Sequence, residues 1–222
     1  MKVSFVIPAF NNWDLTHQLL WDIYKKCGSS NLHEVILVDD ASNEDTFSKG
    51  LEWWKNSKLQ NLDVIHNEKN LGFLLTANKG LQQATGDIII LISTDVKIYS
   101  NVVKLIKERL NSFPKTLISG KVYTTTTGWN EIDGKIYPYA EGFLLAATNE
   151  GWKELGYFDP IYAPSDFEDV DISTMAINRG YELWQLPEGA VVHRGAQTIG
   201  YSLEREKITT KNKERFIKKW IK

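Results

Sequence analysis

The chain has very little cysteine and no long apolar run. It has one cysteine, Cys27, among 222 residues, which excludes an internal disulfide framework and fits a reducing compartment. Apolar runs such as Ile88–Ile92 are far shorter than the roughly 20 residues of a membrane-spanning helix. The N-terminal VSFVIPAF is too short for the core of a signal peptide and indicates a strand. We therefore expect a cytoplasmic protein without a transmembrane segment.

Glycine-rich phosphate loops are also missing. The chain has neither the G-x-G-x-x-G pattern nor a P-loop, which weakens dinucleotide-binding and ATPase interpretations. Its hydrophobic content of 42% is ordinary for a soluble protein, and its length suits one well-filled α/β domain.

What the chain does have is an alternation of strand and helix signals, which indicates an α/β fold with a doubly wound, mostly parallel central sheet flanked by helices. Strands are predicted at Val3–Pro8, Val35–Val38, Asp63–His66 and Ile88–Ile92, and helices at Asp14–Lys26, Thr46–Trp54, Thr76–Ala84 and Val102–Leu110. Leu117–Tyr123 and Gly142–Ala147 are predicted strands around a polar excursion, residues 124–135. No linker or repeat divides the chain, so we expect a single domain.

Three of the predicted strands end in polar residues: Asn11, the pair Asp39 and Asp40, and Asp95. Ligands of such sheets bind beyond the carboxyl ends of the strands, so these side chains are expected to share one rim. A carboxylate at Asp39 or Asp40 can accept from a base imide or a ribose hydroxyl, or can simply cap the following turn.

Asp95 suits Mg²⁺ or Mn²⁺ bound together with a pyrophosphate, because such ions take one or two hard oxygen ligands from the protein. His193 follows a short apolar run and can add a nitrogen ligand that favours Mn²⁺. Its neighbour Arg194 can offset the charge of a diphosphate. The alternative is that His193 has only a structural role.

Glu168, Asp169 and Asp171 fall within four positions, after a segment that holds two prolines. Their repulsion must be offset by cations, hydrogen bonds or a raised pKa. Such a cluster suits a general base or a metal site. It equally suits the N-terminal end of a helix, which favours acidic residues.

The C-terminal end is basic although the whole chain has a net charge of −2. Residues 205–222 hold eight basic and two acidic residues, a charge of +6, so residues 1–204 carry −8. An apolar stripe on the predicted helix is flanked by lysines and consists of Phe216, Ile217, Trp220 and Ile221. Either the stripe docks on the domain with the lysines solvated, or the helix lies on an anionic surface.

Seven stretches resemble, in order and spacing, the family-2 inverting glycosyltransferases with the GT-A fold, and most closely the branch that includes rhamnosyltransferase-like enzymes. They are VSFVIPAFN (3–11), VDDAS (38–42), NEKNLGFLLTANKGLQQATGD (67–87), LISTDV (91–96), EGFLLAATNEGWKELGYFDP (141–160), FEDVDIS (167–173) and VVHRGAQT (191–198). Together they cover nearly the whole chain.

The resemblance implies a role for individual residues. Asp40 would contact the nucleotide base, Asp95 would be the final Asp of the D-x-D metal motif, His193 its downstream metal ligand and Asp169, next to Glu168, the catalytic base. Ser93 stands where that motif has its first Asp, so one metal-binding charge is missing. The other residues expected at the nucleotide-sugar site are Pro8, Ala9, Asn11, Asn70, Gly72, Asn78, Thr94 and Arg194.

The implied activity is metal-assisted transfer of a sugar from a nucleotide-diphospho-sugar to an acceptor hydroxyl, by a single displacement that inverts the anomeric carbon. Residues 1–98 would bind the donor, residues 99–204 the acceptor, and residues 205–222 would form the basic helix, with possible contact to an anionic membrane surface. The acceptor can be a glycan, a lipid-linked molecule or another hydroxyl compound, and aromatics such as Trp129 and Tyr139 can stack on sugar rings.

Two alternatives remain. A sugar nucleotidyltransferase shares the overall architecture, but it would need glycine and a basic residue directly after the first strand, where this chain has PAFNNWD. A non-catalytic module that binds a nucleotide sugar or a glycan is favoured only by Ser93 and the compact length.

Overall fold

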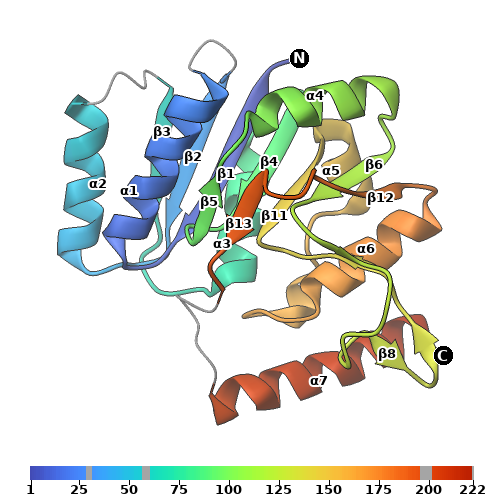
Figure 1. Cartoon of the computed structure of the whole chain (residues 1–222). Coiled ribbons are helices and arrows are strands. Elements are labelled where there is room, and N and C mark those ends of the chain that lie inside the picture. Colours follow the sequence, from blue (N-terminus) through green and yellow to red (C-terminus); the bar gives the residue numbers. More distant parts are fainter. Residues whose placement is uncertain (29–31, 57–60, 196–201, 222) are drawn as a thin grey trace.

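The structure is a computed structural model that describes residues 1–28, 32–56, 61–195 and 202–221 (Figure 1). Its centre is a seven-stranded sheet in the order β12-β6-β11-β4-β1-β2-β3. Six of these strands run in one direction, and β11 alone among them is antiparallel to its neighbours β4 and β6. The strands are β1 Val3–Ala9, β2 Glu34–Asp39, β3 Leu62–His66, β4 Ile88–Ile92, β6 Thr116–Ser119, β11 Leu144–Thr148 and β12 Glu182–Gln185.

Three small two-stranded ladders accompany the main sheet. They pair β5 (Val96–Ile98) with β13 (Val191–His193), β7 (Val122–Tyr123) with β10 (Tyr139–Ala140), and β8 (Glu131–Ile132) with β9 (Lys135–Ile136). The helices are α1 Trp13–Asp22, α2 Glu44–Asn56, α3 Phe73–Gln83, α4 Val102–Ser112, α5 Asn149–Leu155, α6 Glu168–Asn178 and α7 Leu203–Trp220, with a π-helical turn η1 (Ile23–Cys27) and a 3₁₀ turn η3 (Pro160–Tyr162).

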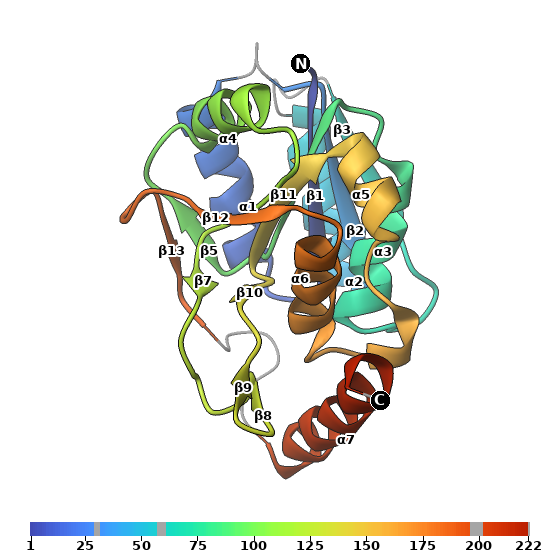
Figure 2. The ribbon, with the colours of Figure 1, turned by 90° about the vertical axis from the view of Figure 1, so that its right-hand side faces the viewer.

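Helices cover both faces of the sheet, which explains why the central strand β4 is apolar throughout (Figure 2). Phe5 of β1 and Ile90 of β4 belong to the core on the side of α1 and α4. Val6 and Leu91, one residue further along each strand, belong to the core on the side of α3, α5 and α6. Successive side chains of a strand point to opposite faces, so two cores are built from the same strands.

One glycine fixes how closely α3 lies on the sheet. A Cβ added to Gly80 would lie 2.4 Å from Val6 Cγ1 and 2.9 Å from Val38 Cγ2. A residue with a Cβ fits there only if the side chains of Val6 and Val38 move, so glycine lets α3 lie close to β1 and β2.

The expected fold is confirmed: the sheet is mostly parallel, flanked by helices, and forms a single domain. One feature of the second half differs from expectation. The predicted strand Leu117–Tyr123 is split, because β6 ends at Ser119 and the chain turns at Gly120 into β7. The strand predicted at Gly142–Ala147 is β11, and it runs against its neighbours.

The basic C-terminal helix is docked on the domain beneath α6 (Figures 1 and 2). Phe216 is fully buried, and Ile217, Trp220 and Ile221 pack against the same core. The expectation that the lysines are merely solvated is wrong for Lys219, whose Nζ donates to Asp159 at 2.8 Å and to Asp171 at 2.9 Å. No helix in the described ranges combines the length and the apolar composition that a bilayer crossing requires.

Candidate active site

Asp95 and His193 are brought together by the β5–β13 ladder. Asp95 follows β4 and is 6% exposed, and His193 pairs with Val96 in the antiparallel register. His193 Nε2 lies 3.3 Å from Asp95 Oδ1, and the Arg194 N–H donates to the Asp95 carbonyl at 3.0 Å. Residues almost a hundred positions apart therefore share one corner of the rim.

This pair fits two ligands of one octahedral ion, because donors that bind at about 2.1–2.2 Å and at right angles lie about 3 Å apart. Burial lowers the pKa of His193, but hydrogen bonds and charges from Asp95 and Glu141 outweigh it and raise that pKa to about 9. Within the described residues no group of three His, Cys, Asp or Glu side chains is arranged to hold a metal. Two protein donors would leave the remaining positions to phosphate oxygens and water.

A short segment before β11 connects this pair to the acidic cluster. Glu141 Oε1 lies 3.7 Å from His193 Nδ1, the Gly142 N–H donates to Asp169 Oδ2 at 3.2 Å, and the Phe143 ring stacks on His193 with centroids 4.4 Å apart. The carbonyl of Phe143 also accepts from the N–H of Ser93 at 2.8 Å. Residues 141–143 thus contact both His193 and Asp169.

The three clustered acids have different environments. Burial raises the pKa of Asp169 to about 7; N–H donation from Gly142 and Val170 opposes this rise, and the charge of Glu141 adds to it. Burial also raises the pKa of Glu168 well above its ordinary value, with the charge of Asp169 adding to the effect. Within the described part of the chain, Glu168 Oε2 is buried without a hydrogen-bond partner.

Asp171 has a structural role instead. Its Oδ1 accepts from the Tyr162 hydroxyl at 3.0 Å and from Trp220 Nε1 at 2.7 Å, and its Oδ2 accepts from Lys219. All three donors fasten α6 to its surroundings. The cluster therefore divides into Asp171, which docks α7, and Glu168 and Asp169, which face the segment before β11.

The two acids at the end of β2, Asp39 and Asp40, shape a loop. Asp40 is 4% exposed; its Oδ1 accepts from Asn67 Nδ2 at 2.9 Å and from the Leu71 N–H at 2.8 Å, and its Oδ2 accepts from the Gly72 N–H at 2.9 Å. Asp39 Oδ2 accepts from the Ser42 N–H at 3.2 Å and lies 2.7 Å from His66 Nδ1. The turn role weighed for these acids is present, and the predicted contact of Asp40 with a base remains a prediction.

The other predicted donor-site residues fall into two groups. Pro8 and Ala9 are buried at the end of β1, and Asn11, with φ 52°, accepts from the Asn43 N–H at 3.0 Å through its side chain. Thr94 is buried beside Asp95, and Arg194 is exposed beside His193.

The remaining three lie on α3 or its entry loop. Asn70 accepts from the Gly72 N–H at 3.1 Å through its side chain, and Gly72 has φ 82° and touches Pro164. Asn78 is buried, and its side-chain amide donates to the carbonyl of Phe158 at 2.7 Å and accepts from its N–H at 3.0 Å. Asn78 therefore fastens α3 to the loop before η3, a contact that accounts for its burial.

The sequence of residues 4–169 matches the model of the family described as "Glycosyl transferase family 2". The chain belongs to this family. Among curated relatives, an undecaprenyl-phosphate 4-deoxy-4-formamido-L-arabinose transferase of Proteus mirabilis is 34% identical over 97 residues, which cover 43% of this chain and 29% of the relative. The chain spans less than half the length of the first curated relatives that it matches.

Solved structures share the fold of this family-2 chain. A mannosyltransferase of Pyrobaculum calidifontis in complex with GDP-Man and Mn²⁺ has a TM-score of 0.70 at 21% identity, covering 90% of this chain and 58% of its own. GalNAc-T7 with UDP, GalNAc and Mn²⁺ has a TM-score of 0.78 at 19% identity, covering 99% of this chain and 48% of its own. Both similarities support the GT-A architecture.

The sequence of this family-2 chain did not predict that Glu141 contacts His193 or that Gly142 contacts Asp169. Both lie inside the matching stretch 141–160, but nothing in their residue types indicates that they contact His193 and Asp169. Tyr123 and Tyr139 were also missed as neighbours of the acids: their rings stack with centroids 5.0 Å apart, and burial together with the charges of Glu141 and Asp169 raises both pKa values.

Among the aromatic residues of the second half, Tyr137, Phe143 and Trp152 are buried, whereas Trp129 is 51% exposed. Trp129 and the partly exposed Tyr139 remain available to an acceptor.

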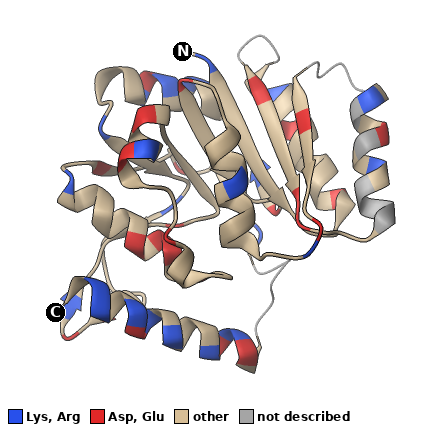
Figure 3. Cartoon of the chain, turned by 180° about the vertical axis from the view of Figure 1, so that it is seen from behind, with Lys and Arg blue, Asp and Glu red and all other residues tan. Residues whose placement is uncertain are grey.

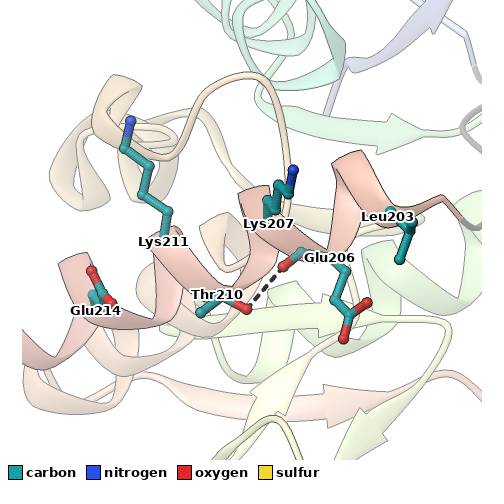
Figure 4. A pocket seen from close by; sticks show the side chains of 6 residues that line it. All are labelled: Leu203, Glu206, Lys207, Thr210, Lys211 and Glu214. Carbon is teal, nitrogen blue, oxygen red and sulfur yellow. Dashed lines mark hydrogen bonds between the residues drawn. The ribbon is translucent and has the colours of Figure 1, made fainter.

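A shallow hollow of about 460 Å³ lies along α7 rather than at the rim (Figure 4). It is lined by one stripe of that helix: Leu203, Glu206, Lys207, Thr210, Lys211 and Glu214. None of these residues belongs to the Asp95–His193 pair or the acidic cluster, so we assign the hollow no part in the chemistry.

Proposed function

We propose that this family-2 chain transfers a sugar from a nucleotide-diphospho-sugar to an acceptor hydroxyl with inversion at the anomeric carbon. The observation that carries the proposal is that residues 141–143 touch both Asp169, whose pKa is about 7, and His193, which is paired with Asp95. Such a displacement requires a base for the acceptor hydroxyl and a cation for the leaving diphosphate. Asp169 can be the base, and Asp95 with His193 can hold the cation.

In this proposal Asp169 takes the proton of the acceptor hydroxyl as the new glycosidic bond forms. The bond between the anomeric carbon and the diphosphate breaks in the same step, so no covalent enzyme intermediate is needed. Asp95 and His193 would hold Mn²⁺ or Mg²⁺, which supplies positive charge to the leaving diphosphate when bound. The two solved relatives that contain Mn²⁺ with a nucleotide or nucleotide sugar support this choice of ion.

The division of labour along the chain is also part of the proposal. Residues 1–98 would bind the donor, with Asp40 at the base and Pro8, Ala9 and Asn11 around it. Residues 99–204 would bind the acceptor, and residues 205–222 would face a cytoplasmic, anionic membrane surface. A rhamnosyltransferase-like donor preference rests on the seven matching stretches alone.

The test is a panel of UDP-, GDP- and dTDP-sugars, scored first by thermal shift and then by turnover with Mn²⁺. Binding to the folded state raises the melting temperature by mass action, so the stabilising donor identifies the nucleotide and the sugar. The Asp169→Asn protein should bind that donor normally and turn over at least about 10²-fold more slowly.

Ser93 favours one other function, a non-catalytic nucleotide-sugar-binding module, because it removes a metal-binding charge. Donor binding without hydrolysis or transfer, with Mn²⁺ present and a range of glycan and lipid acceptors, would establish that function. A panel in which no nucleotide sugar stabilises the protein would contradict both.

A further inference from the structure

The backbone just before the acidic cluster is held in an unusual conformation. Asp166 and Phe167 have φ values of 71° and 74°, in the left-handed region that residues with a Cβ rarely adopt. They directly precede Glu168 and Asp169, so their conformation sets the direction in which α6 begins. Two consecutive strained residues persist only where the surroundings hold them in place.

Those surroundings are supplied by α7. Arg205 donates to both carboxylate oxygens of Asp166, with Nη2–Oδ1 at 2.9 Å and Nε–Oδ2 at 3.2 Å, and the Thr209 hydroxyl donates to Asp166 Oδ2 at 2.7 Å. Side-chain Nδ2 of the fully buried Asn212 lies 2.8 Å from the carbonyl oxygens of Tyr162, Ser165 and Asp166.

Helix α7 also contacts Phe167 and Asp171, which lie on either side of Glu168 and Asp169. The ring of Phe167 packs against Phe216 with centroids 5.8 Å apart, and Asp171, one turn into α6, accepts from Trp220 and Lys219. Contacts from α7 therefore reach both ends of the segment that carries Glu168 and Asp169, as the position of α7 beneath α6 suggests (Figure 2).

We propose that α7 is a positioning element for the reaction centre: it fixes the left-handed turn at Asp166 and Phe167 and thereby aims Asp169 at the segment before β11. Arg205, Thr209 and Asn212 are its positioning residues. The inference rests on the proposed role of Asp169 and assigns the C-terminal helix a function beyond stability. If α7 loosens, the carboxylate of Asp169 loses its geometry while the donor site at the ends of β1, β2 and β4 stays intact.

The chain offers a matched pair of variants for the test. Thr209→Val removes the hydroxyl that contacts Asp166 and, at 2.9 Å, the Arg205 carbonyl. Thr210→Val removes the neighbouring hydroxyl, which makes the matching 2.9 Å contact with the Glu206 carbonyl four residues back (Figure 4). Thr209→Val should lower kcat about tenfold with donor KM changed by less than about twofold, because only the reacting geometry is disturbed. Thr210→Val should leave both constants unchanged, and Thr209→Ser, which restores the hydroxyl, should recover most of kcat.

A second pair removes a charge. Arg205→Gln breaks the double contact with Asp166, and Lys153→Gln removes the same charge from an exposed position on α5. Hydrogen–deuterium exchange of the amides of residues 165–171 provides a readout that needs no activity. Exchange should rise in Thr209→Val and Arg205→Gln and stay unchanged in the two control variants.

The results separate this inference from the proposed function. Faster exchange with an unchanged kcat, or equal kcat in both members of each pair, would overturn the positioning role. Should Asp169→Asn retain wild-type turnover, the proposed base is wrong, and exchange in the threonine pair still decides whether α7 fixes the turn. Faster exchange together with the fall in kcat supports the inference.

Discussion

The backbone N–H of Gly142 donates a hydrogen bond to Asp169 Oδ2 at 3.2 Å. A donor of this kind stabilises the ionised carboxylate, while burial and the charge of Glu141 favour the protonated form. The balance leaves the pKa of Asp169 at about 7. A carboxylate with this pKa is a stronger base than an ordinary one, and about half of it is ionised at pH 7, which suits general-base catalysis.

The first prediction is a pH profile. Because Asp169 must be deprotonated to accept a proton, kcat/KM for transfer should rise about tenfold per pH unit below pH 7 and level off above it. The residual activity of Asp169→Asn should lack this rise. A wild-type profile that is flat between pH 5 and 8, or a rise that survives in Asp169→Asn, would move the base elsewhere.

The same pKa predicts the sign of a stability effect. The folded protein holds a proton on Asp169 up to about pH 7, whereas an unfolded Asp releases it near pH 4, so this group makes the wild type less stable as pH rises through that window. Asp169→Asn should therefore raise the melting temperature relative to wild type by a few degrees more at pH 8 than at pH 5. Asp63→Asn, on an exposed position of β3, removes a surface carboxylate and is the matched control.

Another prediction concerns the metal. Asp95→Asn and His193→Ala should each weaken Mn²⁺ binding about tenfold or more in the presence of UDP or GDP, measured by calorimetry, because each removes one of two protein donors. His33→Ala removes a histidine whose Nε2 lies 3.1 Å from the Thr85 hydroxyl, and this variant should bind Mn²⁺ normally. Wild-type affinity in His193→Ala would leave that residue with a structural role only.

Part of this site could be predicted from the sequence. Polar residues at the ends of parallel strands must share a rim, so Asp40 and Asp95 were placed by periodicity alone. The residue types suggested that His193 could join Asp95 as a ligand, but not how the two meet, because the β5–β13 ladder that joins them consists of two three-residue strands. Ladders this short leave almost no pattern in a sequence.

Other features depend on tertiary contacts that no local pattern encodes. The reversed direction of β11 places residues 141–143 at the rim, and strand direction has no signature in residue types. The division of the acids into Asp171, which docks α7, and Asp169, which faces Gly142, depends on where α7 lies. The left-handed conformation of Asp166 and Phe167 was equally hidden, because neither residue is a glycine.

A further prediction separates the structural role of Asp40 from its predicted contact with a nucleotide base. Asp40→Asn replaces an acceptor of three hydrogen bonds with a group that cannot accept all of them. The free energy of unfolding should fall by about 1–3 kcal/mol, as measured by urea denaturation. Asn70→Ala removes one exposed contact to the same loop. This variant should change the free energy of unfolding by less than about 0.5 kcal/mol. A stable Asp40→Asn protein that loses nucleotide affinity would instead show that Asp40 serves the ligand.

The last prediction concerns the outer face of α7 and an anionic membrane surface. Lys207, Lys211 and Lys218 are exposed and lie on one stripe of the helix, with Lys and Arg residues recurring along its length (Figure 3). Truncation after Ser202 is unsuitable as a test, because it would remove the buried Phe216, whose loss alone should cost about 3–5 kcal/mol of stability.

The better variant replaces those three lysines with glutamine and keeps the docked face intact. Each basic residue near an acidic bilayer contributes about 1 kcal/mol, so the triple variant should bind phosphatidylserine vesicles about 100-fold more weakly in co-sedimentation. Glu214 lies in the same stripe and offsets part of the attraction, so Glu214→Gln should strengthen binding. Wild-type binding should also weaken as salt is added, since added ions screen exposed charges beyond about 10 Å at 0.1 M. If wild type and triple variant both bind negligibly to anionic and neutral vesicles, the predicted membrane contact is wrong. Helix α7 then keeps its structural contacts to Asp166 and Asp171.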